Sequence, residues 1–256
     1  MGLVVLVAVA SGRVVLENLI FFPDRLMPPT PPGVLDRFIT TADGVRIHAW
    51  YVAPPGATAT LLWSHGNGGN IGNRTEILLA LAARRLAVLA YDYRGYGRSE
   101  GAPDEAGVYR DAEAAYDELR ASGVPAERII AFGESLGGAV SIRLATERPC
   151  AGVAVVATFT SLRDVARVHY GLAGAAIGSR FDSLGRLGRL RVPLFVAHGD
   201  QDEIVPYELG ERVFAAAPEP KRFLRVHGAT HNDVLGDPQL LDALATFARD
   251  AVAQNR

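Results

Sequence analysis

The chain has 256 residues, with 26 Lys and Arg against 28 Asp and Glu, so its formal net charge is −2. Hydrophobic residues make up 49% of it, which is too apolar for a disordered chain. The near-neutral charge argues against a nucleic-acid-binding protein, and a single cysteine excludes an internal disulfide or a cysteine-based zinc site. The length suits one α/β domain with a large core.

An apolar stretch opens the chain, from Gly2 to Ala10 and, after Arg13, from Val14 to Phe22. The first run is much shorter than the roughly 20 residues that span a bilayer. No Lys or Arg precedes it, which disfavours a secretory signal. Three interpretations stay open: a helix packed on the domain, the remnant of a shortened membrane anchor, and a helix lying at a membrane interface.

A proline-rich connector follows the apolar stretch. Prolines cannot continue a helix, so the connector is expected to be extended. It contains Pro23, Pro28, Pro29, Pro31 and Pro32. We therefore predict an N-terminal segment and connector over residues 1–34 and one main domain over residues 35–256.

The main domain is predicted to begin with two strands, Phe38–Thr41 and Val45–Val52, joined by a turn. Alternating residue types in the second strand indicate a position near a sheet edge. Five short, nearly all apolar runs then follow, as is typical of strands buried on both faces of a parallel sheet. They are Thr60–Ser64, Ala87–Tyr91, Ile129–Phe132, Val153–Ala157 and Pro193–Ala197.

Helical patterns separate these strands and continue after them. The helical patterns cover Arg74–Arg85, Asp104–Ala121, Leu136–Glu147, Tyr207–Ala216 and Pro238–Val252. A last short strand is predicted at Phe223–Val226, between the last two of these helices. Such an alternation predicts an α/β fold with a mostly parallel sheet. Residues 162–190 are longer than a minimal crossover, and they predict either a small cap over a site or a longer helical connection.

The motif Gly133-Glu134-Ser135-Leu136-Gly137 fits G-x-S-x-G, the sharp turn that exposes a nucleophilic serine in α/β hydrolases. An apolar strand precedes the motif and a helical pattern follows it, as this turn requires. Gly133 and Gly137 leave room where side chains would collide across the turn. Ser135 is therefore the predicted nucleophile.

A serine hydroxyl needs a base within hydrogen-bonding reach, and the base needs an acid that orients it. In this fold the partners follow in the order serine, acid, histidine. His231 precedes the last predicted helix and is the predicted base, with His227 in reserve. Asp200, Asp202 and Glu203 follow the strand that ends at Ala197, and all three qualify as the acid by position alone.

Two glycine-containing loops follow neighbouring strands. The loop His65–Asn70 can offer a backbone N–H to a developing oxyanion, together with the N–H of Leu136 after the nucleophile. Asn67 is the favoured donor in that loop. The next loop, Asp92–Ser99, is interpreted as a structural brace. A phosphate-binding loop is disfavoured because no Gly-Lys-Ser/Thr sequence ends the first loop.

Over nearly its whole length the chain resembles the α/β-hydrolase superfamily, and most of all its small serine hydrolases that often carry an N-terminal hydrophobic anchor. The matching segments are Phe21–Pro23, His65–Asn70, Tyr93–Ser99, Gly133–Gly138, His198–Pro206 and Gly228–Asn232. The resemblance implies a mostly parallel central sheet flanked by helices, a small or minimal cap, and a catalytic domain over residues 35–256. It also implies Asp202 as the acid and Asn67 as an oxyanion residue, and it favours the shortened anchor.

The expected function is a serine hydrolase that cleaves carboxylic esters through an acyl-enzyme. Its predicted catalytic residues are Ser135, Asp202 and His231, with the N–H groups of Asn67 and Leu136 holding the oxyanion. This chemistry needs no metal or organic cofactor. Alternatives are an acyl thioesterase or a peptidase with the same triad and, less favoured, a ligand-binding protein without catalysis.

The expected partner is a small acyl ester or thioester, and no nucleic acid is expected. Contact with a membrane surface through residues 1–22 stays open, as does the choice between the cytoplasm and the membrane of a bacterial cell. The sequence does not reveal the acyl-chain length, the physiological substrate or the oligomeric state.

Overall fold

Eight strands form one sheet in the order β10-β9-β8-β7-β4-β6-β3-β2. The computed structural model describes residues 19–172 and 180–254. The strands are β2 (Leu35–Thr40), β3 (Arg46–Val52), β4 (Ala59–Ser64), β6 (Leu86–Tyr91), β7 (Ile129–Glu134), β8 (Gly152–Val156), β9 (Leu194–Gly199) and β10 (Lys221–Val226). Pairing is antiparallel at the β2–β3–β6 end and parallel elsewhere in this sheet, which confirms a mostly parallel sheet.

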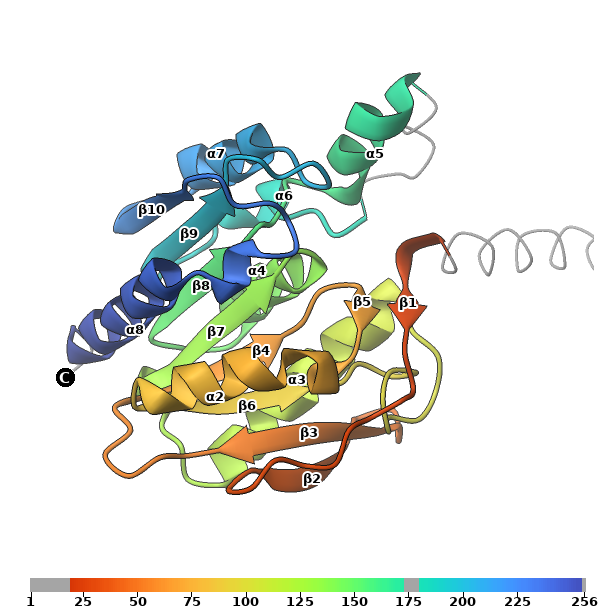
Figure 1. Cartoon of the computed structure of the whole chain (residues 1–256), viewed down its shortest axis with the longest axis vertical. Coiled ribbons are helices and arrows are strands. Elements are labelled where there is room, and N and C mark those ends of the chain that lie inside the picture. The colour runs from red at the N-terminus through yellow and green to blue at the C-terminus, as the bar shows by residue number, and fades with distance from the viewer. Residues whose placement is uncertain (1–18, 173–179, 255–256) are drawn as a thin grey trace, which may run out of the picture.

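Helices cover both faces of this sheet (Figure 1). They are α2 (Thr75–Ala83), α3 (Glu105–Ala121), α4 (Leu136–Glu147), α7 (Tyr207–Ala216) and α8 (Pro238–Ala253). One apolar cluster contains side chains of α3, α4 and α7, and a second contains side chains of α2 and α8. Because both faces are covered, β4, β6, β8 and β9 are buried along their whole length, and this explains their continuous apolar runs.

Strand β3 departs from the expected alternation of buried and exposed residues. His48 and Trp50 lie on the face expected to be polar, yet both are fully buried. The carboxylate of Asp36 on β2 explains how their polar atoms are accommodated. Its Oδ1 lies 2.7 Å from Nε2 of His48 and accepts a hydrogen bond from Nε1 of Trp50 at 3.0 Å. A neighbouring strand thus supplies the partner that a sequence pattern does not show.

Residues 162–190 contain two short helices, α5 (Leu162–Tyr170) and α6 (Leu184–Leu187). Residues 173–179 between them lie outside the described residues. Nε2 of His169, near the end of α5, lies 2.7 Å from the carbonyl oxygen of Ile204 in the loop after β9. This contact places α5 beside the edge of the sheet where the parallel strands end.

A separate two-stranded pairing joins the beginning of the described chain to the loop after β4. Strand β1 (Phe22–Pro23) runs parallel to β5 (Gly68–Gly69). Residues 1–18 of the predicted apolar segment lie outside the described residues, so the three interpretations of that segment stay open, as does the boundary at Leu35. No helix in the described ranges has both the length and the apolarity that crossing a membrane requires.

Candidate active site

Ser135 occupies the sharp turn between β7 and α4. Its backbone has φ 50° and ψ −118°, in the positive-φ region that non-glycine residues rarely adopt. Three hydrogen bonds hold the serine there. Its N–H donates to the carbonyl of Val156 at 2.9 Å, and its own carbonyl accepts from the N–H of Gly138 at 3.0 Å and from Oγ1 of Thr158 at 2.9 Å. The surroundings therefore impose the strained conformation.

Glycines make this turn sterically possible. A Cβ atom on Gly133 would overlap the backbone of Gly137, and one on Gly137 would overlap the carbonyl of Ser64 on the neighbouring strand. Both obstacles are main-chain atoms, which cannot rotate away as a side chain would. The clearance that the motif predicts is therefore present on both sides of Ser135.

The variant Gly137→Ala is expected to be destabilised by at least about 2 kcal/mol, because the added methyl group must displace backbone in a packed sheet. Urea unfolding followed by circular dichroism measures the difference. Gly188→Ala is the matched control, since Gly188 has φ −61° and a Cβ atom there meets nothing within 4 Å. Equal stability of the two variants would contradict the steric argument.

Of the three sequence-predicted triad residues, His231 lies within hydrogen-bonding distance of both Ser135 and Asp202. Nε2 of His231 lies 3.1 Å from Oγ of Ser135, and Nδ1 of His231 lies 2.8 Å from Oδ2 of Asp202. Asp202 follows β9 and His231 follows β10, two strands that pair side by side. The Asp202 side chain is fully buried, whereas that of His231 is 11% exposed.

The surroundings of Asp202 favour its ionised form. Burial alone raises the pKa of this carboxyl group, but hydrogen bonds with His198 and His231, the charge of His231 and the N–H of Val205 lower it more. The resulting pKa lies well below the usual value for aspartate. Oδ1 accepts from the N–H groups of Ile204 at 3.0 Å and Val205 at 2.7 Å, which fixes the carboxylate and leaves Oδ2 facing His231.

The other candidate residues point elsewhere. Asp200 accepts from Nε of Arg225 at 2.8 Å and from the N–H of Gly228 at 2.7 Å, and it lies 3.1 Å from Nδ1 of His227. His227, the reserve base, is 79% exposed at the side chain. Glu203 is exposed. Of the three acids that position alone leaves open, only Asp202 lies within hydrogen-bonding distance of His231 in the described chain.

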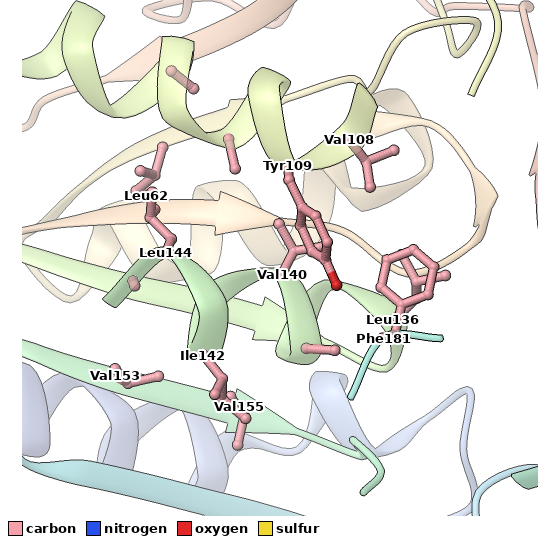
Figure 2. Packing of buried hydrophobic residues seen from close by; sticks show 14 of the residues in the cluster. Leu62, Val108, Tyr109, Leu136, Val140, Ile142, Leu144, Val153, Val155 and Phe181 are labelled. Carbon is pink, nitrogen blue, oxygen red and sulfur yellow. The ribbon is translucent and has the colours of Figure 1, made fainter. Parts of the chain in front are cut away.

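The two predicted oxyanion donors keep their N–H groups unused. In the part of the chain that the structure describes, neither the N–H of Asn67 nor that of Leu136 donates to a protein acceptor. The side chain of Leu136 is buried in the apolar cluster with Val140 and Phe181 (Figure 2). The main-chain N–H of Leu136 is thus presented at the first position of α4 while its side chain anchors the helix.

An ion pair that the sequence did not indicate links the nucleophile turn to the loop His65–Asn70. Oε1 of Glu134 forms a close ion pair with Nε of Arg74 and accepts from the N–H of Gly66 at 3.0 Å. Nη1 of Arg74 donates to the carbonyls of Gly68 at 3.2 Å and Asn70 at 3.0 Å. Glu134 occupies a variable position of G-x-S-x-G, so the motif carried no signal for this contact.

A cavity of about 690 Å³ opens over Ser135 and His231. This volume lies within the range of small-molecule sites. Its polar lining includes Asn73, Arg74, Glu134, Asn232 and Asp233, and its apolar lining includes Ile77, Val156, Ala157, Ile204, Val234 and Leu235. Within residues 19–172 and 180–254, no three His, Cys, Asp or Glu side chains gather as they would around a metal ion.

The loop Asp92–Ser99 braces neighbouring segments, as the sequence indicates. Oδ1 of Asp92 accepts from the N–H of Ile71 at 2.8 Å, just beyond the loop His65–Asn70. The guanidinium of Arg94 pairs with Asp111 on α3 and with Asp43 in the turn between β2 and β3, both at 2.8 Å. These contacts join the loop to α3, to the turn between β2 and β3, and to the segment that follows the loop His65–Asn70.

Sequence relatives match most of this chain. It is 39% identical over 255 residues to an uncharacterized protein of Mycobacterium tuberculosis, covering 93% of this chain and 91% of the relative. It is 28% identical over 231 residues to the uncharacterized protein YfhR of Escherichia coli, covering 86% of this chain and 81% of the relative.

Solved structures share the fold at low sequence identity. The esterase Pf2001 of Pyrococcus furiosus superposes with a TM-score of 0.75 at 19% identity, over 90% of this chain and 97% of that chain. An esterase domain from Rhodothermus marinus superposes with a TM-score of 0.67 at 23% identity, over 86% and 99%. A family model described as serine aminopeptidase, S33, matches residues 55–185, which include the Ser135 motif. The chain therefore belongs to the S33 serine aminopeptidase family of α/β hydrolases.

Proposed function

We propose that this protein is a serine hydrolase that cleaves carboxylic esters through an acyl-enzyme intermediate. One observation carries the proposal: the hydrogen-bonded series from Ser135 through His231 to the buried, ionised Asp202 opens onto a cavity of small-molecule size. A weak nucleophile, a base and an orienting acid are thereby aligned as nucleophilic catalysis requires.

In the acylation step, Oγ of Ser135 forms a bond to the acyl carbon while Nε2 of His231 takes the hydroxyl proton. The carbonyl electron pair moves to its oxygen, where the N–H groups of Asn67 and Leu136 donate. When the intermediate collapses, the bond to the alcohol breaks and His231 returns the proton to the departing oxygen. Each oxyanion donor is expected to contribute a factor of about 10²–10³ in rate.

In the deacylation step, water attacks the acyl carbon and gives a proton to His231. Collapse of the second intermediate breaks the bond to Oγ, releases the carboxylic acid and returns the proton to Ser135. Throughout the cycle Asp202 holds Nδ1 of His231, which fixes the tautomer and stabilises the imidazolium ion.

The cavity favours esters over peptides with a free amino terminus, despite the aminopeptidase in the family description. An aminopeptidase must recognise the substrate ammonium group, commonly with carboxylates. Of the two carboxylates that line this cavity in the described chain, Glu134, next to Ser135, is charge-paired with Arg74, and one oxygen of Asp233 already accepts a backbone hydrogen bond. Glu134 pairs with Arg74 and accepts from Gly66, and Oδ1 of Asp233 accepts from the N–H of Thr230 at 2.6 Å. The solved structures named above as esterases agree with this preference. A thioester is the second candidate, because the same nucleophile and oxyanion donors serve it.

A fluorophosphonate probe combined with a substrate panel tests the proposal. The probe should label the wild-type chain at Ser135 and leave Ser135→Ala unlabelled. The panel contains p-nitrophenyl esters of increasing acyl length, the matching acyl thioesters, and aminoacyl p-nitroanilides. Ester turnover should exceed that of the anilides by at least about 10²-fold, since an ester has the better leaving group and needs no ammonium site. Labelling that persists in Ser135→Ala, or faster hydrolysis of the anilides, would overturn it.

A further inference from the structure

The described chain begins with a segment, Leu19–Met27, that lies against the loop His65–Asn70; we call it the N-terminal strap. Two of its side chains are anchored in the core, since Ile20 and Phe21 are 5% and 4% exposed. The Phe21 ring meets the Phe181 ring edge-on, with centroids 6.1 Å apart. In Figure 1 this segment lies beside β5, near the ends of the parallel strands.

The strap binds Asn67 through both its side chain and its carbonyl. Nδ2 of Asn67 donates to the carbonyl of Ile20 at 2.8 Å, and the Asn67 carbonyl accepts from the N–H of Phe22 at 3.0 Å. Oη of Tyr96 donates to the same carbonyl at 2.7 Å. These three bonds hold the side chain and the carbonyl of Asn67 and leave its N–H unused.

A second set of hydrogen bonds joins the strap to the loop through Asn70, whose side chain is fully buried. Nδ2 of Asn70 donates to two strap carbonyls, those of Asp24 at 3.0 Å and Leu26 at 2.8 Å. Its Oδ1 accepts from the N–H of Gly72 at 2.8 Å and so caps the turn that follows. One amide side chain therefore joins the strap, the loop and the start of the next helical turn.

The loop needs such outside support because Gly66, Gly68 and Gly69 have no side chains with which to hold their own conformation. The Arg74–Glu134 pair holds Gly66, Gly68 and Asn70, but the hydrogen bonds of Asn67 run to the strap and to Tyr96. The position of the Asn67 N–H relative to Ser135 thus depends on residues more than 40 positions earlier in the chain.

We propose that the N-terminal strap positions the oxyanion loop, so that Asn70 and the side chain of Asn67 act as positioning residues for the Asn67 N–H. This role rests on the proposed function, in which that N–H stabilises the oxyanion. The oxyanion exists in the transition state and not in the bound ester. Loosening the strap should therefore lower kcat with little change in KM.

The variant Asn70→Asp tests the role with almost no change in shape. It keeps an oxygen to accept from Gly72 but places the other oxygen against the carbonyls of Asp24 and Leu26. We expect kcat for p-nitrophenyl acetate to fall by about 10- to 100-fold, up to the contribution of one oxyanion donor, and KM to stay within about 3-fold. The inhibition constant of a trifluoromethyl ketone, whose serine adduct carries an oxyanion, should rise in parallel.

Two further variants keep the test decisive if Asn70→Asp is poorly folded. Asn67→Ala removes only the bond to Ile20 and retains the main-chain N–H, and it should lower kcat by about 3- to 10-fold. Leu26→Ala is the matched control on the strap, because that side chain is 83% exposed and its carbonyl is kept. It should leave kcat unchanged. A KM increase without loss of kcat, or equal kcat in Asn67→Ala and Leu26→Ala, would overturn the proposal.

Amide hydrogen exchange separates this proposal from the proposed function. Asn70→Asp and Asn67→Ala should speed exchange across residues 66–70 and leave residues 200–204 unchanged, whatever the reaction is. Unaltered exchange in the loop would refute the strap's role even in an active esterase. A wild-type chain that neither turns over esters nor reacts with the fluorophosphonate would refute the proposed function alone.

Discussion

Replacing Ser135 by alanine is expected to lower kcat for a short p-nitrophenyl ester by at least about 10⁴-fold, as loss of the nucleophile does in enzymes of this mechanism. The methyl group cannot form the acyl-enzyme, and His231 loses the hydroxyl that lies 3.1 Å from its Nε2. KM should change little, because the cavity wall that binds the ester is otherwise intact. Residual hydrolysis would come from the oxyanion donors and from substrate binding.

Ser141→Ala is the matched control for that experiment. Ser141 lies on α4, the helix that begins next to Ser135, and it is fully buried. In the described chain its hydroxyl has no hydrogen-bond partner, so alanine should preserve both folding and rate. Steady-state kinetics, with circular dichroism to confirm folding, compares the two variants. Activity retained in Ser135→Ala, or lost equally in both, would remove Ser135 from the mechanism.

Much of this fold follows from short-range patterns. Helices α4 and α7 have the bounds that the sequence predicts, and the buried parallel strands differ from prediction by only a few residues at their ends. Their signals are strong because each apolar run is bounded by turn residues and both sheet faces are covered. The burial of His48 and Trp50 was not predictable, because it depends on Asp36 from an adjacent strand.

The candidate site divides in the same way. Ser135 and His231 could be chosen from a local motif and from chain order. Position alone did not choose the acid, and only the family resemblance implied Asp202, because Asp200 and Asp202 leave the same loop and differ in where their side chains point: toward Arg225 on β10 or toward His231. The pairs Arg74–Glu134 and Asn67–Ile20 join residues that are 60 and 47 positions apart in the chain. A local sequence pattern therefore cannot predict them.

The pH dependence of stability should distinguish Asp202 from an ordinary surface carboxylate. Its folded-state pKa is lowered, so its contribution is fully present above the unfolded pKa of about 3.9 and is lost progressively as the pH falls from that value through the folded-state pKa. The amide introduced by Asp202→Asn cannot titrate. Urea midpoints of the wild type and of Asp202→Asn should therefore differ more at pH 7 than at about pH 2, whereas an equal difference at both would contradict the lowered pKa.

The same variant should have the second large effect on catalysis, a fall in kcat of about 10³–10⁴-fold. Asparagine keeps the size of Asp202 but removes the charge that stabilises the imidazolium ion, and its amide can hold His231 in the wrong tautomer. Asp200→Asn is the matched control, because that carboxylate contacts Arg225 and Gly228 instead of His231. Its kcat should stay within about 3-fold of wild type. If Asp200→Asn were the slower enzyme, the acid would have to be reassigned, since both residues follow the same strand and only the direction of their side chains separates them.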